Sequence, residues 1–275
     1  MKFLEKIDIV IQGPYTDFTD HLSDYYLNLP FVNNIIVSCW DTDKDSIKKR
    51  RVKYVRNKQP NSPGTDNKNL QIVSSLNGLK ECETRFSVKI RSDQKFTHKS
   101  MTEMYYFFME NNERRISFQY NQEKPYNRIL VAGHYPYLLF SCRDHMFWGN
   151  TDDLIDLFDI PLEQNSLVDT IKVPKERLGN YCKYFTRTET YIGAHYCANF
   201  NEEINRILLL PKEHLYDEAI YWHYTKDISN NITPLVFKSF PKSIIDLEWT
   251  RWRKSGFSFN FDEYLQCSSW DEDGF

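Results

Sequence analysis

The chain has 275 residues, of which 41% are hydrophobic and 27% charged, a composition typical of a folded globular protein and not of a disordered chain. Its formal net charge of −3 argues against a dedicated nucleic-acid-binding protein, because such proteins carry a basic excess. The 6 cysteines include no Cys-x-x-Cys pair, so neither a zinc site of that spacing nor a small disulfide scaffold is predicted.

Aromatic residues reach 16%, which suits either a surface that stacks on bases and sugar rings or a core built from large rings. No secretory signal or membrane-spanning stretch is recognised in the sequence. We therefore expect a cytoplasmic protein with at most peripheral membrane contact, for example at the inner face of the inner membrane.

Short β-branched runs alternate with helix-like segments through the first part of the chain. Strands that alternate with helices predict an α/β fold, with a mostly parallel sheet and helices on both of its faces. The elements expected in chain order are a strand at 7–11, a helix at 17–29, strands at 34–40 and 52–55, a long loop at 57–69, a helix at 69–82, a strand at 86–90, a helix at 100–112, a strand at 116–120, and helices at 152–158, 202–209 and 211–224.

Three polar loops follow predicted strands, where ligands bind in parallel sheets. They are Gln12-Gly13-Pro14, Ser38-Cys39-Trp40-Asp41 and Arg91-Ser92-Asp93. The first loop lacks the spacing of a dinucleotide-binding or phosphate-cradling glycine loop, so a dehydrogenase and a nucleoside triphosphatase are disfavoured.

Each loop allows a binding and a structural interpretation. Asp93 could ligate Mg²⁺ or Mn²⁺ through oxygen, and Arg91 could contact a phosphate or simply pair with Asp93. Trp40 could cover a nucleobase or pack inward. Asp41 could accept from a ribose hydroxyl or cap a helix.

The chain resembles the WavE family of lipopolysaccharide-synthesis proteins. The resemblance rests on six segments that occur in order. They are IVIQGP at 9–14, VSCW at 37–40, NLQIVSSLNGL at 69–79, VKIRSD at 88–93, DHMFWGNTDDL at 144–154 and ETYIG at 189–193.

This resemblance implies a GT-A-like, Rossmann-type fold and transfer of a sugar from a nucleotide-sugar donor. Because the sequence shows no internal repeat and no low-complexity linker, we expect one domain over residues 1–275, with a nucleotide-sugar-binding half at 1–120 and an acceptor-side half or subdomain at 121–275. Ser92-Asp93-Gln94 takes the place of the family's metal-binding acidic motif, with one acid instead of two. Asp93 would then hold a divalent cation, Mn²⁺ or Mg²⁺.

The residues that would bind the donor follow from the same resemblance. Asn69 and Gln71 open the helix that leads toward the metal strand, and their amides could reach a base or phosphate, or Asn69 could only cap the helix. The full donor-binding set is Gln12, Gly13, Pro14, Ser38, Trp40, Asp41, Asn69, Gln71, Arg91 and Ser92.

Glu189 and Asp144 are the preferred candidates for a catalytic base near the acceptor hydroxyl. Asp144 lies beside His145 in an aromatic stretch that could desolvate a carboxylate. Glu189 precedes Tyr191-Ile192-Gly193, which is interpreted as an acceptor-side turn. Other acids and histidines are weaker candidates. Asp217 and Glu218 could act as bases, and Asp152-Asp153 could be a metal pair, although the capped start of a helix is favoured. One of His134, His195, His214 and His223 could complete a metal shell.

The predicted function is therefore a glycosyltransferase that moves a sugar from a nucleotide-sugar to a bacterial surface glycan, either lipopolysaccharide or capsule. The acceptor would be a glycan or a lipid-linked glycan, and no nucleic acid is expected as a partner. Two alternatives stay open: a carbohydrate- or nucleotide-binding protein without turnover, and a sugar nucleotidyltransferase.

Overall fold

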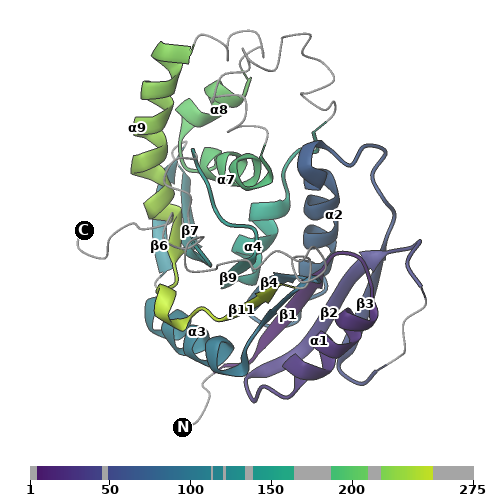
Figure 1. Cartoon of the computed structure of the whole chain (residues 1–275). Helices are drawn as coiled ribbons and strands as arrows, with labels where there is room; N and C mark the ends of the chain where they lie inside the picture. Colours follow the sequence, from purple (N-terminus) through teal and green to yellow (C-terminus); the bar gives the residue numbers. More distant parts are fainter. Residues whose placement is uncertain are drawn as a thin grey trace.

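The computed structural model describes residues 5–44, 49–112, 114–119, 122–133, 139–163, 187–209 and 218–249. Its centre is a seven-stranded sheet in the order β10-β8-β9-β4-β1-β2-β3 (Figure 1). The strands are β1 Ile7–Gln12, β2 Val32–Trp40, β3 Val52–Asn57, β4 Phe86–Arg91, β8 Ile129–Val131, β9 Met146–Asn150 and β10 Phe237–Ser239.

All neighbouring strands of this sheet run parallel except where β9 is involved. β9 is antiparallel to both β4 and β8, whereas β4, β1, β2 and β3 form a continuous parallel set. The predicted α/β architecture with a mostly parallel sheet is therefore confirmed. The sheet contains strands from both sides of residue 120. β1 to β4 come from the N-terminal part of the chain, and β9, β8 and β10 continue the same sheet beside β4.

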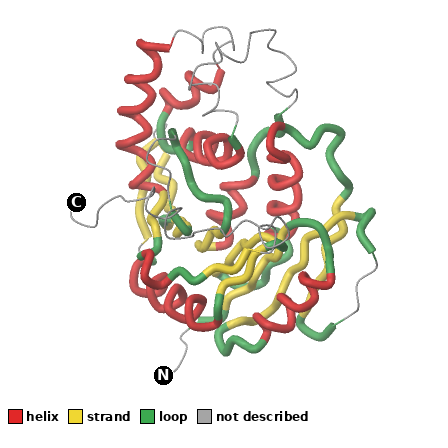
Figure 2. The backbone as a smooth tube through the Cα atoms, viewed as in Figure 1, coloured by secondary structure: helices red, strands yellow, loops and turns green. Residues whose placement is uncertain are grey.

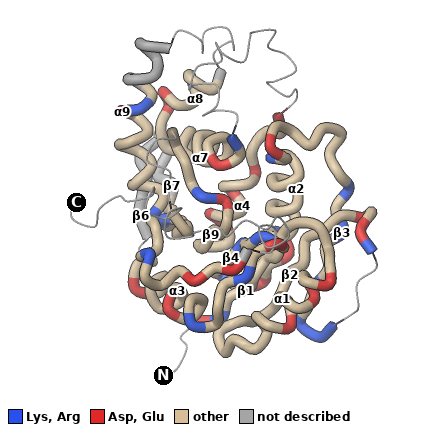
Figure 3. The backbone as a smooth tube through the Cα atoms, viewed as in Figure 1, with Lys and Arg blue, Asp and Glu red and all other residues tan. Residues whose placement is uncertain are grey.

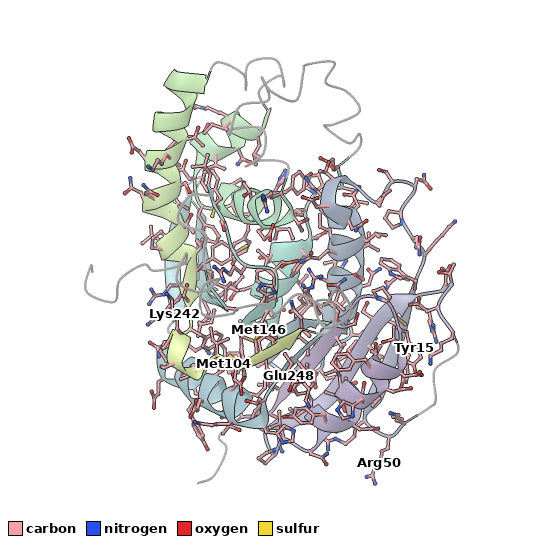
Figure 4. All side chains as sticks on the ribbon, viewed as in Figure 1. Tyr15, Arg50, Met104, Met146, Lys242 and Glu248 are labelled. Carbon is pink, nitrogen blue, oxygen red and sulfur yellow. The ribbon has the colours of Figure 1, made fainter. Side chains whose placement is uncertain are left out.

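Helices cover both faces of the sheet (Figure 2). On one face, Ile9 and Ile11 of β1 pack with residues of α1 and α3, including Met104, which Figure 4 labels together with Met146 of β9 from the same core. On the other face, Val10 packs with residues of α2, α4 and α7. Alternate side chains of a strand point to opposite faces, so this one short strand contributes to both cores.

The helices have the following bounds. They are α1 Asp17–Leu27, α2 Lys68–Leu79, α3 His98–Asn111, α4 Thr151–Phe158, α7 Thr188–Ala198, α8 Glu202–Leu209 and α9 Glu218–Val236, with short 3₁₀ turns at Thr65–Asn67 and Lys242–Ile244. Within the described ranges, no helix is long and apolar enough to cross a membrane.

Two small antiparallel pairs complete the described structure. β5 (Gln94–Phe96) pairs with β11 (Leu247–Trp249), and β6 (Arg114–Gln119) pairs with β7 (Gln122–Asn127). The strand predicted at 116–120 therefore exists over most of its length, but it belongs to the pair with β7 and not to the central sheet.

Asp8, the polar residue within the first apolar run, is fully buried at the edge of the sheet where the parallel strands begin. Its Oδ1 accepts from Asn34 N at 2.9 Å, and its Oδ2 accepts from the main-chain N–H groups of Glu83 at 2.6 Å and Thr84 at 3.1 Å. Hydrogen bonds to a charged carboxylate are strong. Asp8 therefore holds the first residues of β2 and the residues just before β4 against the start of β1.

Other expectations from the sequence need correction at the helices. α2 begins at Lys68 after Asn67, so Asn69 lies in the first turn and is not the helix cap. Of the helix expected at 211–224, residues 211–217 lie outside the described residues, and the rest belongs to α9, which continues to Val236. The segment around Gly193 is not a turn but the middle of α7, because Thr190, Ile192 and Gly193 are buried against the second core.

Gly193 brings α7 against the chain that leads into β9. A Cβ added at this position would lie 1.8 Å from the main-chain oxygen of Phe140, so Gly193→Ala must push the two segments apart. We expect a loss of about 1–3 kcal/mol in the free energy of unfolding, measured by urea denaturation. Gly149→Ala is the control, because the nearest atom there is a Leu154 side-chain carbon at 3.3 Å that can move. Equal effects of the two changes would contradict this packing.

Candidate functional site

The three polar loops named from the sequence meet at one edge of the sheet. β1 lies between β2 and β4, and Gln12 is in register with both Ser38 and Arg91. The main chain joins the loops further, since Gly13 N donates to Ser38 O at 3.1 Å and Ser92 N donates to Gln12 O at 2.8 Å. The carboxyl ends of these parallel strands therefore form one continuous surface, as ligand sites in such sheets require.

Gly13 is required at this edge by its backbone and by its surroundings. Its φ is +131°, and an added Cβ would lie 2.5 Å from Ser92 Oγ. Only glycine adopts such a conformation readily. Gln12 and Ser92 are both buried beside it, whereas Pro14 is exposed.

The second loop has mainly structural contacts. Ser38 is fully buried, and its Oγ donates to Ser74 O of α2 at 2.6 Å and accepts from Asn57 Nδ2 at 2.8 Å. Trp40 is only 4% exposed, so the inward-packing interpretation of this side chain holds. Asp41 is exposed.

Asp43, which the sequence did not single out, organises this second loop. Its Oδ2 accepts from Trp40 N and from Tyr15 N, each at 2.9 Å. One carboxylate therefore fixes the ends of β1 and β2 relative to each other. Its position in the sequence, within a polar stretch that contains other acids, did not distinguish it from a solvent-exposed carboxylate.

Asn69 is also engaged in structural contacts. Its Nδ2 donates to Glu163 O at 2.8 Å and to Ser62 O at 3.1 Å, while its Oδ1 accepts from Glu163 N at 2.8 Å. The Glu163 carboxylate in turn accepts from Thr65 N at 2.6 Å and pairs with buried Lys68 at 3.2 Å. This contact joins the start of α2 to the chain after α4, and it uses the amide groups of Asn69 that were expected to reach a donor.

Arg91 is the centre of the charged part of the site. Its Nε and Nη2 donate to the two oxygens of Asp93 at 3.0 and 3.1 Å, and its Nη1 donates to Asp144 Oδ2 at 2.7 Å. The fork of a guanidinium matches a carboxylate in this bidentate way. Figure 3 shows acidic and basic segments close together around the ends of β1 and β4.

Gln71 and Lys89 extend this cluster under Arg91. With its amide oriented to satisfy both neighbours, Gln71 donates to Asp144 Oδ2 at 3.0 Å and accepts from Lys89 Nζ at 3.1 Å. Lys89 also donates to the main-chain oxygen of Asp144 at 3.0 Å. Gln71 was predicted from the sequence, but Lys89 was missed, because a lysine within a strand gives no sign of the face to which it points.

The candidate acids Asp144 and Glu189 have opposite proton affinities. Burial raises the pKa of Asp144, but Arg91 and Lys89 outweigh it and lower the value to about 2. Burial, together with the negative charge of Asp144, raises the pKa of Glu189 to about 7. Two carboxylates whose pKa values are pushed apart are a common sign of distinct acid and base roles.

His145 is buried next to Asp144 and is held neutral. Its Nδ1 lies 2.5 Å from Gln94 Nε2, which can only donate, so the ring nitrogen accepts. Burial lowers the pKa of His145 to about 4. A neutral imidazole adds no positive charge to the cluster at pH 7, where Arg91 is the permanent cation paired with Asp144.

The other predicted acids and histidines lie elsewhere. Asp152 and Asp153 begin α4, and Asn150 Oδ1 caps this helix by accepting from Asp152 N at 3.0 Å, as expected. His195 packs on Tyr191 with ring centroids 4.4 Å apart. His134, His214 and Asp217 lie outside the described residues, while Glu218 and His223 belong to α9.

The described side chains do not fit a divalent cation at Asp93 in this arrangement. Both oxygens of Asp93 accept from Arg91. In the part of the chain that the structure describes, no group of three or more His, Cys, Asp or Glu side chains could hold a metal ion. Mg²⁺ and Mn²⁺ take several oxygen ligands, so a cation would first have to displace the guanidinium. No step of the transfer proposed below is routed through a metal ion.

The fold and the site define an α/β protein with a charged, partly buried cluster at the carboxyl edge of its sheet. Residues 7–233 match the model of the family described as WavE lipopolysaccharide synthesis. The chain therefore belongs to this family. No curated protein matches it.

Solved structures with a similar fold share little sequence with the chain. The 4-diphosphocytidyl-2C-methyl-D-erythritol synthase of Anaerococcus prevotii is 9% identical, with a TM-score of 0.39, over 66% of this chain and 85% of the other. S. aureus TarS is 12% identical, with a TM-score of 0.39, over 77% of this chain and 41% of the other. TarS 1-349 in complex with UDP-GlcNAc is 10% identical, with a TM-score of 0.37, over 91% and 92%. These similarities concern the fold alone.

The raised pKa of Glu189 predicts a pH-dependent effect of Glu189→Gln on stability. The folded chain holds the Glu189 proton up to a pH of about 7, whereas the unfolded chain releases it near the ordinary value of 4.5. Wild-type stability should therefore fall, relative to the variant, as the pH rises from 4.5 through 7. Relative to wild type, the free energy of unfolding of the variant should rise by about 1–3 kcal/mol between pH 4 and pH 8, as measured by urea denaturation at the two pH values. A difference that does not change with pH would contradict the assigned pKa.

Proposed function

We propose that this protein is a glycosyltransferase that moves a sugar from a nucleotide-sugar donor to a bacterial surface glycan or its lipid-linked precursor. The observation that carries the proposal is the Arg91–Asp93–Asp144 cluster at the carboxyl edge of the parallel sheet. It lies in a chain of a lipopolysaccharide-synthesis family.

In this proposal the donor lies over the ends of β1 and β4. Gly13 lets the Ser92 side chain pack directly against the main chain that follows β1, so the ends of β1 and β4 form one surface on which the diphosphate would lie. Arg91, whose side chain is 23% exposed, contacts the diphosphate and offsets the negative charge that grows on it as the sugar leaves. When the donor binds, a phosphate group would replace either Asp93 or Asp144 as a partner of Arg91, so the guanidinium would stay paired with an anion before and after binding.

Glu189 is the better of the two candidate bases. A general base works best when its pKa lies near the working pH, and the pKa of Glu189 is about 7. Asp144, with a pKa of about 2, is a weak base that stays ionised. Its proposed role is to orient Arg91 and to raise the proton affinity of Glu189.

A donor panel tests the proposal directly. Purified protein is incubated with UDP-, GDP- and CMP-sugars in buffer containing Mn²⁺ and Mg²⁺, so that a cation requirement cannot hide turnover, and the released nucleotide is measured. Release from one donor class is expected. Pyrophosphate formed from a nucleoside triphosphate and a sugar 1-phosphate would instead indicate a nucleotidyltransferase. Tight donor binding without any release would indicate a binding protein.

Arg91→Met should weaken binding of the nucleoside diphosphate of the active donor by about 10-fold or more, since a charge-assisted contact is worth at least 1.4 kcal/mol. Titration calorimetry measures this affinity. The control is Arg50→Met, because Arg50 is exposed and points away from the protein (Figure 4). Equal affinity in the two variants would rule out a phosphate contact by Arg91.

Glu189→Gln should lower turnover by about 100-fold or more, the usual contribution of a general base, with little change in donor affinity. Glu202→Gln is the matched control, because Glu202 occupies the first turn of α8 as Glu189 occupies that of α7. Steady-state kinetics separate the two effects. Turnover close to wild type in Glu189→Gln would move the role of base to another residue.

A further inference from the structure

Lys89 is a fully buried lysine in the centre of the sheet. It lies on β4, the strand that ends at Arg91, and its Nζ is 5.4 Å from the ring centroid of Phe147 and 5.8 Å from that of Phe158. Within the described part of the chain, its Nζ forms no salt bridge with a carboxylate. Its two polar contacts are neutral oxygens, Asp144 O at 3.0 Å and Gln71 Oε1 at 3.1 Å.

Packing alone does not explain a lysine at this position. Burial of a charge without an ionic partner is costly, and a Met of similar length would fill the space between two aromatic rings without that cost. The cost is visible in the proton affinity, because burial lowers the pKa of Lys89 to about 7. A lysine at this buried position therefore points to a role that depends on its hydrogen bonds.

These hydrogen bonds converge on Asp144 at two points. Lys89 holds the main-chain oxygen of Asp144 directly. Through Gln71, which accepts from Lys89 and donates to Asp144 Oδ2, it also fixes the carboxylate. The same Oδ2 accepts from Arg91 at 2.7 Å, so the orientation that Lys89 and Gln71 give to Asp144 sets the place of the guanidinium.

We infer that Lys89 is a positioning residue of the active site, which acts through Gln71 and Asp144 to hold Arg91 where the donor diphosphate binds. The inference rests on the proposed function for the identity of the ligand, but the geometry of Asp144 can be measured without any ligand. The charged and titratable groups that face Lys89 are Arg91 and Asp93 from the end of β4, and Asp144 and Cys142 from the segment before β9.

The variant Lys89→Met tests whether Lys89 positions Asp144 or only stabilises the fold, because the two roles predict different changes in stability and turnover. The variant lacks the buried charge, so it should be at least as stable as wild type in urea at pH 6. This advantage should shrink as the pH rises from 7 toward 10.5, because the unfolded wild-type chain keeps a proton there that the folded chain has released. Turnover of the active donor should nevertheless fall by about 10-fold or more. The titration of the Asp144 carboxyl group, followed by carbon NMR, should move to higher pH.

Two further variants complete the test. Gln71→Leu should reproduce the loss of turnover, and the double variant should lose little more than either single one, because both act on the same carboxylate. Lys238→Met is the matched control, a lysine on β10 that contacts Asn111 and the ring of Phe107, and it should leave turnover and the Asp144 titration unchanged.

Several results would overturn the inference. These are an unchanged Asp144 titration in Lys89→Met, a turnover within about 2-fold of wild type, or a parallel loss of stability and turnover at pH 6. If wild-type protein releases nucleotide from no donor, the proposed function fails, and the Asp144 titration alone still decides whether Lys89 positions this carboxylate.

Discussion

The ion pair between Arg91 and Asp144 joins two parts of the chain that lie far apart in sequence, and the site depends on it. Arg91 ends the parallel strand β4, whereas Asp144 precedes β9, the antiparallel strand that continues the sheet beside β4. Removal of one partner of this partly buried pair leaves an uncompensated charge, which destabilises the folded state. The pair therefore keeps both side chains at the edge of the sheet, and Asp93, Gln71 and Lys89 are arranged around it.

The fold makes this arrangement possible through register and through close packing. Gln12 at the end of β1 is in register with both Ser38 and Arg91. The three loops that follow β1, β2 and β4 therefore begin side by side at the same edge of the sheet. On the face of the sheet that carries Lys89 and Arg91, α2 brings Gln71 over the strands, and α7 brings the half-buried Glu189 near Asp144. Acids and bases with well-separated proton affinities thus result from ordinary α/β packing, with Gly193 allowing α7 to approach the chain before β9.

The sequence was sufficient for the parallel sheet and for the gathering of the three loops, because apolar runs mark buried strands and polar residues mark their ends. It also placed Arg91, Asp144 and Gln71 among the candidates. It could not reveal Lys89, Asp43 or Glu163, whose roles depend on contacts between distant segments. It also could not decide between the binding and structural alternatives for Ser38, Trp40 and Asn69, because each choice depends on which neighbours a side chain meets after folding. Glu189 was among the candidate acids, but the residues that follow it, Tyr191 to Gly193, were expected to form a turn and instead belong to α7, because a glycine in the sequence suggests a break in a helix.

The most direct test of the donor site is a crystal structure of the protein with the nucleoside diphosphate of whichever donor it uses. The diphosphate should lie over Gly13 at the carboxyl ends of β1 and β4, with a phosphate oxygen within hydrogen-bonding distance of the Arg91 guanidinium. A nucleotide bound at the opposite edge of the sheet, or at this edge but with Arg91 still held only by Asp93 and Asp144, would contradict the assignment of this cluster to the donor.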